Sequence, residues 1–267
     1  MKVKYNVIWL LFLLLLGNTF AKVEKDPAKA AAALAALDSV EIPRPVNTEA
    51  FAPGEYLKFS VDYGFVNAGW AIMEVVSIVE YKGRLAYHFQ TTAGTNKTFS
   101  LFFKVEDRVE SLLDMENFYS LRHEKHLSEG NYHADRWFTF DQENHRAVSK
   151  DYDIKTYPNV LDVLSAFYYT RTLEFEPGDT FFLPNHTDGK NYPLRVAVHQ
   201  VEKVTVPAGT FECIVVEPIL KSAGIFEQKG NVYVWLTNDE KKMPVLMKTK
   251  IIIGSIDARL QEYRLPD

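Results

Sequence analysis

The chain has 267 residues, enough for one well-filled hydrophobic core and too few for a multi-domain assembly. Apolar residues make up 47% and charged residues 24%, which excludes wholesale disorder, and the net charge of −5 argues against nucleic-acid coats and anionic-membrane binders. The aromatic content of 13% favours β structure. A single cysteine, Cys213, excludes an intramolecular disulfide and a Cys-rich zinc site.

Residues 1–21 have the pattern of a secretory signal peptide. Lys2 and Lys4 precede an apolar run over 7–16, and Ala21 is the expected cleavage residue. The run is shorter than the roughly 20 apolar residues of a membrane-spanning helix, and no cysteine is placed to carry a lipid anchor. We therefore expect a periplasmic or secreted protein with no transmembrane helix in the mature chain; an uncleaved anchor is the alternative.

Residues 22–50 are expected to be a linker or a loosely docked helix. The alanine-rich run over 28–37 has high helix propensity, and Pro43 and Pro45 then enforce extended backbone. A solvated spacer is favoured over a partner-binding helix. Residues 51–267 are expected to form a single antiparallel β domain.

Apolar residues alternate with polar ones from residue 55 onward, which is the pattern of strands with one solvated face. Short turns separate the strands, such as Lys82-Gly83 and Gly130-Asn131. The absence of βαβ alternation excludes Rossmann and TIM-barrel folds. We predict an all-β antiparallel meander forming a closed or half-open barrel or a strongly curved sheet. The predicted strands are 55–63, 70–79, 85–90, 105–113, 118–129, 132–140, 145–150, 180–183, 192–206, 211–221, 232–236, 245–253 and 256–263.

One helix interrupts this pattern near residues 162–173, where apolar residues recur at helical spacing. Asn159 or Asp162 can cap its start, and Arg171 near its end is expected to bond the last carbonyls. We expect the helix to plug or cover the sheet; the alternative is a lid over a ligand cavity.

The sequence contains no recognisable catalytic constellation. It has no GxSxG, GxGxxG or P-loop motif, and Cys213 lies in an apolar strand, where a thiol is buried and inert. His123 and His126 are three residues apart on a predicted strand, so their rings point to opposite faces. A surface histidine cluster is therefore favoured over a metal site. We expect no catalytic residues, metal, cofactor or nucleic-acid partner.

The aromatic residues are the remaining candidates for function. Most are explained by core and cross-strand packing, but a subset can line an apolar or stacking cleft for a lipid, glycan or peptide. The candidate ligand-binding residues are Trp70, Phe102, Trp137, Tyr168 and Trp235.

Several short segments resemble a known group of sequences. They are GEYLKF at 54–59, NAGW at 67–70, DVLSAFYYTR at 162–171, PGD at 177–179 and VPAGTF at 206–211. In order and spacing they resemble bacterial exported proteins of domain-of-unknown-function family 3108, over roughly 51–263. The resemblance implies an envelope β protein with no assigned activity, and it supplies no catalytic residues.

Three functions are consistent with these features. The favoured one is a non-enzymatic cell-envelope protein that binds or carries an apolar or amphipathic ligand such as a lipid. The alternative is a structural or assembly partner of another envelope protein. The second alternative, a hydrolase of envelope glycans or lipids, requires two carboxylates, or a nucleophile and a base, to converge in one pocket.

Overall fold

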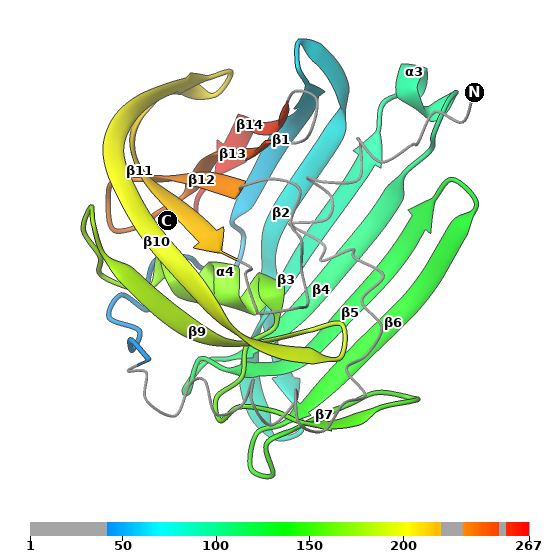
Figure 1. The fold of residues 1–267 in the computed structure, drawn as a ribbon, viewed down its shortest axis with the longest axis vertical. Coiled ribbons are helices and arrows are strands. Elements are labelled where there is room, and N and C mark those ends of the chain that lie inside the picture. Colours follow the sequence, from blue (N-terminus) through cyan, green and yellow to red (C-terminus); the bar gives the residue numbers. More distant parts are fainter. Residues whose placement is uncertain (1–41, 220–231, 251–254, 267) are drawn as a thin grey trace.

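The computed structural model describes residues 42–219, 232–250 and 255–266 (Figure 1). The predicted signal peptide with its cleavage residue Ala21, and residues 22–41 of the predicted linker, lie outside this part of the chain. The described residues form one large antiparallel sheet that is strongly curved and not closed, and they confirm the predicted fold class. No helix in the described ranges combines the length and apolar character needed to cross a bilayer.

The sheet has fourteen strands and is accompanied by two helices in the described residues. The helices are α3 (Lys97–Ser100) and α4 (Val163–Arg171). The strands are β1 (Tyr56–Tyr63), β2 (Val66–Tyr81), β3 (Arg84–Thr95), β4 (Glu106–Asp114), β5 (Ser120–Glu129), β6 (Tyr132–Asp141), β7 (Arg146–Val148), β8 (Asp153–Lys155), β9 (Thr180–Thr187), β10 (Lys190–Val206), β11 (Gly209–Ile219), β12 (Val232–Thr237), β13 (Pro244–Lys250) and β14 (Ser255–Arg264).

Two meanders build the sheet, in the order β8-β7-β6-β5-β4-β3-β2-β1-β14-β13-β12-β11-β10-β9. Strands β1 to β8 follow one another outward in one direction, and β9 to β14 return from the opposite edge. The antiparallel pair β1–β14 joins the two meanders, with Val61 opposite Ala258. Strand β8 was not predicted, because three residues are too few to show an alternating pattern.

Helix α4 lies on the concave side of the sheet, as expected for a helix that covers it (Figure 1). Asp162 is its N-cap and accepts hydrogen bonds from the backbone N–H groups of Leu164 and Ser165. Residues 43–47 run along its C-terminal end, where the Tyr169 hydroxyl donates to the Pro43 carbonyl at 2.7 Å. The helix and this segment thus occupy the concave side of the curved sheet.

Side chains connect the two far ends of the sheet. Lys125 on β5 forms a buried ion pair with Asp188 in the β9–β10 turn, at 2.9 Å. Asn191 on β10 donates to the Lys155 carbonyl on β8 at 2.6 Å. Leu161, just before α4, forms a parallel bridge with Asn185 on β9. The sheet therefore curls until β9 and β10 lie close to β5, β8 and the segment before α4. Side chains and one isolated bridge join them, rather than a continuous ladder.

Candidate ligand-binding site

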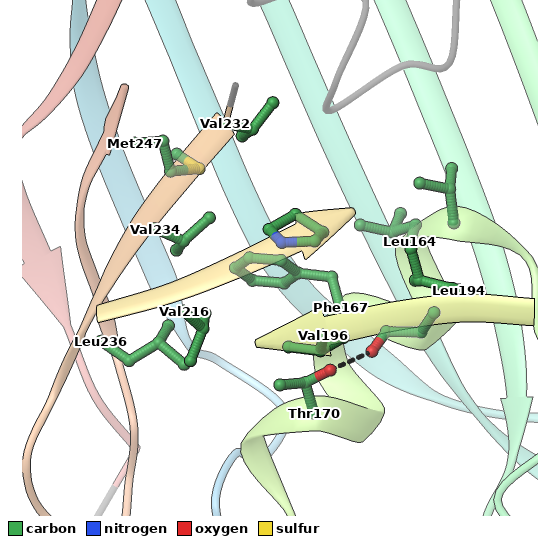
Figure 2. Close-up of a pocket in the computed structure, with 13 residues that line it drawn as sticks. Leu164, Phe167, Thr170, Leu194, Val196, Val216, Val232, Val234, Leu236 and Met247 are labelled. Carbon is green, nitrogen blue, oxygen red and sulfur yellow. Dashed lines mark hydrogen bonds between the residues drawn. The ribbon is translucent and has the colours of Figure 1, made fainter. Parts of the chain in front are cut away.

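An apolar cavity of about 90 Å³ lies between α4 and the strands β10 to β13 (Figure 2). One side of α4 contributes Phe167, whose ring faces the strands in the close-up. The full lining is Val163, Leu164, Ala166, Phe167, Thr170, Leu194, Val196, Val216, Pro218, Val232, Val234, Leu236 and Met247. Since valines supply much of this wall and reach only a short distance from the backbone, the space between helix and sheet stays unfilled.

Among the described residues, the cavity offers no free polar group. Thr170 is the one polar residue of this described lining, and its hydroxyl donates to the Ala166 carbonyl at 2.8 Å within the helix (Figure 2). A polar ligand group placed here would lose its hydrogen bonds to water without replacing them, at a cost of about 1–3 kcal/mol. The described lining is therefore chemically suited to hydrocarbon and unsuited to polar groups.

A buried ion pair fixes the C-terminal end of α4. The Arg171 guanidinium donates to both carboxylate oxygens of Glu55 at 2.6 and 2.7 Å, and it also donates to the Ala50 and Lys241 carbonyls. Both side chains are fully buried. Arg171 thus bonds two separate segments, residues 50–55 and Lys241, instead of the last carbonyls of its own helix, which corrects the sequence-based expectation. The pairing could not be found by local pattern, because Glu55 lies 116 residues earlier.

The N-terminal end of α4 is fixed by hydroxyl groups. Asp162 accepts from Ser111, Ser120 and Ser165 at 2.8, 2.6 and 2.7 Å. Burial opposes its ionisation, but His123 beside it and these hydrogen bonds lower the pKa of Asp162 well below its usual range. The ionised cap therefore ties α4 to β4 and β5.

Ser111, His123 and Asp162 bring together the residue types of a hydrolytic triad in a different arrangement. In a triad, histidine uses one ring nitrogen for the serine and the other for the carboxylate. Here Nδ1 of His123 lies 2.9 Å from the Ser111 hydroxyl and 3.2 Å from Asp162. The Ser111 hydroxyl also donates directly to Asp162, and all three side chains are buried. The group anchors the helix and leaves no activated nucleophile facing a pocket.

The prediction of a surface histidine cluster is wrong for His123, because its ring is buried against the start of α4. His126 points to the opposite face, as its spacing required, and pairs with Asp135 at 2.7 Å. Cys213 is buried as predicted, and burial raises its thiol pKa to about 12.

Two buried carboxyls, Asp107 at the start of β4 and Glu129 at the end of β5, lie next to each other. Burial and the neighbouring Glu129 raise the pKa of Asp107 to about 7, although a hydrogen bond from the Ser128 backbone N–H opposes this. Neither residue lines the apolar cavity. This pair therefore adds no acid–base chemistry to the candidate site.

A shallower polar hollow lies along β2 to β6, and Trp70 lines it. The Trp70 ring covers Gly94, where an added Cβ would come within 2.9 Å of it. His126 and Asp135, which both line this hollow, pair with each other.

The five aromatic candidates do not converge on one site. Tyr168 is buried in the core and stacks on Phe89 with ring centroids 3.8 Å apart. Trp137 is partly exposed with Arg122 over its ring, and the Trp235 indole donates to Glu202 at 2.6 Å. Phe102 is 82% exposed on the β3–β4 connection.

The cavity residues were missed by the sequence analysis because most are aliphatic and resemble ordinary core. The one signal in the sequence was that some strands carry apolar residues on both faces. In β11, for example, the neighbours Val215 and Val216 point to opposite faces and are both buried, and only Val216 lines the cavity. Assigning that signal to a cavity requires knowing which strands face α4.

These features define a class: an open antiparallel β-sheet curled around one helix, with an apolar cavity beside that helix. The chain belongs to the family described as protein of unknown function DUF3108, whose model matches residues 58–261. No curated protein matches the sequence.

One solved structure supports the fold, and others are similar to the chain at lower TM-scores. A β-barrel-like protein of domain of unknown function DUF1849 from Brucella abortus is similar with a TM-score of 0.54 and 9% identity, over 86% of this chain and 100% of that one. A Bacteroides fragilis protein with a YmcC-like fold has a TM-score of 0.36 and 16% identity, over 84% and 99%. A DUF1089 family protein from Pseudomonas aeruginosa has a TM-score of 0.37 and 9% identity, over 68% and 90%.

Proposed function

We propose that this protein is an exported, non-enzymatic binding protein for an apolar or amphipathic ligand, which places a hydrocarbon segment in the cavity beside α4. The apolar lining of that cavity carries the proposal. Close-packed interiors have few voids larger than a water molecule, so a space of about 90 Å³ next to the helix is a feature to be explained. Export rests on the signal-peptide pattern of residues 1–21.

The size of the cavity limits what can enter it. An engineered apolar cavity of about 150 Å³ holds a benzene molecule, so this smaller space takes a short stretch of hydrocarbon. A fatty acid or lipid fits this description if one acyl chain enters and its polar headgroup remains in water. Recognition then depends on chain shape, since the lining presents no hydrogen-bonding group to a headgroup.

Cavity filling tests the proposal. The probe is cis-parinaric acid, a fluorescent fatty acid whose emission rises in an apolar site. We expect the wild-type protein to bind it, and Val216→Phe, which places a ring in the cavity, to weaken binding about tenfold or more, equivalent to about 1.4 kcal/mol. Fluorescence titration gives both dissociation constants.

Val201→Phe is the matched control, because Val201 lies on β10, is 37% exposed and does not line the cavity. Its affinity should equal that of the wild type. Circular dichroism and thermal unfolding establish that both variants fold. Equal affinity of the two folded variants, or no binding by the wild type, contradicts the proposal.

A further inference from the structure

Four strongly exposed apolar side chains lie at one rim of the sheet. Phe65 is 108% exposed, Leu101 83%, Phe102 82% and Val66 54%. Phe65 lies in the β1–β2 turn and Val66 is the first residue of β2, and Leu101 and Phe102 follow α3 on the β3–β4 connection. Both tips lie at the upper edge of the sheet in Figure 1. We refer to these four residues as the apolar rim.

Hydrogen bonds hold the two tips together. Asn96, the N-cap of α3, donates its side-chain amide to the Asn67 carbonyl at 2.7 Å, and its backbone N–H donates to the Ala68 carbonyl at 3.0 Å. Phe103 packs back against Gly130, where an added Cβ would come within 2.7 Å of its ring. Because Phe103 anchors the connection, its neighbours Leu101 and Phe102 are left facing solvent.

The rim is locally basic in an acidic protein. Residues 64–69 (GFVNAG) carry no charge, and residues 96–104 (NKTFSLFFK) contain Lys97 and Lys104 but no acid, whereas the whole chain has a net charge of −5. Acidic groups begin at Asp62 and Glu106, and Glu106 pairs with Lys104 at 3.0 Å with both side chains largely exposed. Exposed pairs of this kind are weak and leave the lysine available to another anion.

We propose that the apolar rim inserts into the surface of a lipid bilayer, with Lys97 and Lys104 among anionic headgroups. Exposed aromatic and leucine side chains next to basic residues are what an interfacial membrane contact requires. A stable protein partner would need a continuous surface of about 800 Å² per side. The rim instead presents separate projecting tips, which suit a fluid surface that closes around each side chain.

The net charge of −5 argues against an anionic-membrane binder only where the charge of the whole chain is felt. Headgroup attraction falls off within about 8–10 Å, so at the rim it acts on the local lysines. The proposal stands on exposed residues of the rim and not on the cavity beside α4. A test can therefore contradict the membrane contact without contradicting ligand binding in the cavity, and it can contradict ligand binding without contradicting the membrane contact.

Vesicle flotation tests the rim directly. We expect the wild-type protein to float with vesicles of phosphatidylethanolamine and phosphatidylglycerol, and less with phosphatidylcholine vesicles, which lack the anionic charge. The triple variant Phe65→Ser, Leu101→Ser, Phe102→Ser should lose about tenfold or more of this binding. These side chains are at least four-fifths exposed, so the fold should be retained.

The matched control is the triple variant Val46→Ser, Ile78→Ser, Leu85→Ser, whose residues are 59%, 43% and 59% exposed away from the rim. Leu85 lies at the start of β3 and the rim lies beyond its end, about 30 Å away along the strand. The control should bind vesicles like the wild type. Absence of wild-type flotation, or equal loss in both triple variants, overturns the proposal.

A site-specific probe separates insertion from contact through another face. Phe102→Cys can be labelled with nitrobenzoxadiazole while the buried Cys213 stays unmodified, and its emission should shift to the blue on vesicles. The same label on Leu85→Cys should not shift. Flotation without a shift at residue 102, or cross-linking of residue 102 to a protein in cells without any vesicle binding, would show that the rim is not a bilayer contact.

Discussion

The two sides of α4 are packed differently. On one side Tyr168 stacks on Phe89 with ring centroids 3.8 Å apart and planes within 3°, and Phe51 meets both rings edge-on. On the other side the helix faces a cavity lined by aliphatic residues and Phe167. A helix held only by hydrophobic contact would shift until both sides were filled.

The ends of α4 explain how this asymmetry persists. Asp162 is bonded to three serine hydroxyls at one end, and Arg171 is bonded to Glu55 and two carbonyls at the other. Hydrogen bonds of this kind have narrow distance limits, so they fix the helix in position. Buried polar groups at its two ends therefore set the position of α4. The cavity is the space that this position leaves unfilled between the helix and the strands β10 to β13.

Removing one partner of the ion pair should have the largest effect. Glu55→Gln leaves the Arg171 charge buried without its counter-ion, and we expect a loss of about 3–5 kcal/mol in the free energy of unfolding. Urea denaturation measures it. The double variant Glu55→Leu, Arg171→Met should recover much of the loss, since it buries no charge.

Arg146–Asp153 is the comparison pair, because both side chains are at least 40% exposed. Asp153→Asn should cost less than about 1 kcal/mol. If Glu55→Gln costs no more than Asp153→Asn, the ion pair does not hold the helix.

The opposite end should show a smaller effect that depends on pH. Asp162→Asn replaces an acceptor of several hydrogen bonds by a group with its own N–H donors, and we expect a loss of about 2–3 kcal/mol at neutral pH. The folded-state pKa of Asp162 is lowered, so its contribution is complete above the unfolded pKa of about 4 and is lost as pH falls below it.

Urea midpoints of wild type and Asp162→Asn, measured at neutral pH and again near pH 3, check this prediction. The difference in unfolding free energy between the two proteins should shrink on acidification, because near pH 3 the unfolded wild type takes up a proton on Asp162 while the folded protein, in which the pKa of Asp162 is lowered, does not. A difference that stays constant with pH would contradict the prediction.

One added methylene should have the smallest effect, with opposite signs on the two sides of α4. Val216→Ile extends into the cavity and should stabilise the ligand-free protein by about 0.8 kcal/mol. Val109→Ile, at a fully buried position of β4 on the packed side, should destabilise it by about 1–3 kcal/mol. Thermal unfolding of both variants checks this, and equal signs would show that the two sides are packed alike.

Much of the fold follows from local sequence patterns. The run 132–140 was predicted as a strand and β6 spans Tyr132–Asp141, because polar and apolar residues alternate there and Gly130 supports the turn. The helix predicted at 162–173 spans Val163–Arg171, with Asp162 as its cap. These features depend on neighbours in sequence.

The candidate site depends on neighbours in space. Val196, Val216 and Val234 come from three strands, and only the order of those strands in the sheet places them around one cavity. Glu55 and Arg171 belong to conspicuous segments, GEYLKF and DVLSAFYYTR, but nothing in either segment shows that they pair. Long-range pairing of this kind is what sequence periodicity cannot reveal.

The β1–β14 pairing has a consequence for how the molecule is assembled. Every other strand pairing in the sheet joins consecutive strands, and β14 is the last strand in chain order. Each meander can form from its own local contacts, which are the fast ones to make. Until β14 has emerged from the ribosome, β1 can pair only with β2, and the two meanders cannot be joined into one sheet. The native sheet is therefore completed only after the last residue of β14, Arg264, has been synthesised.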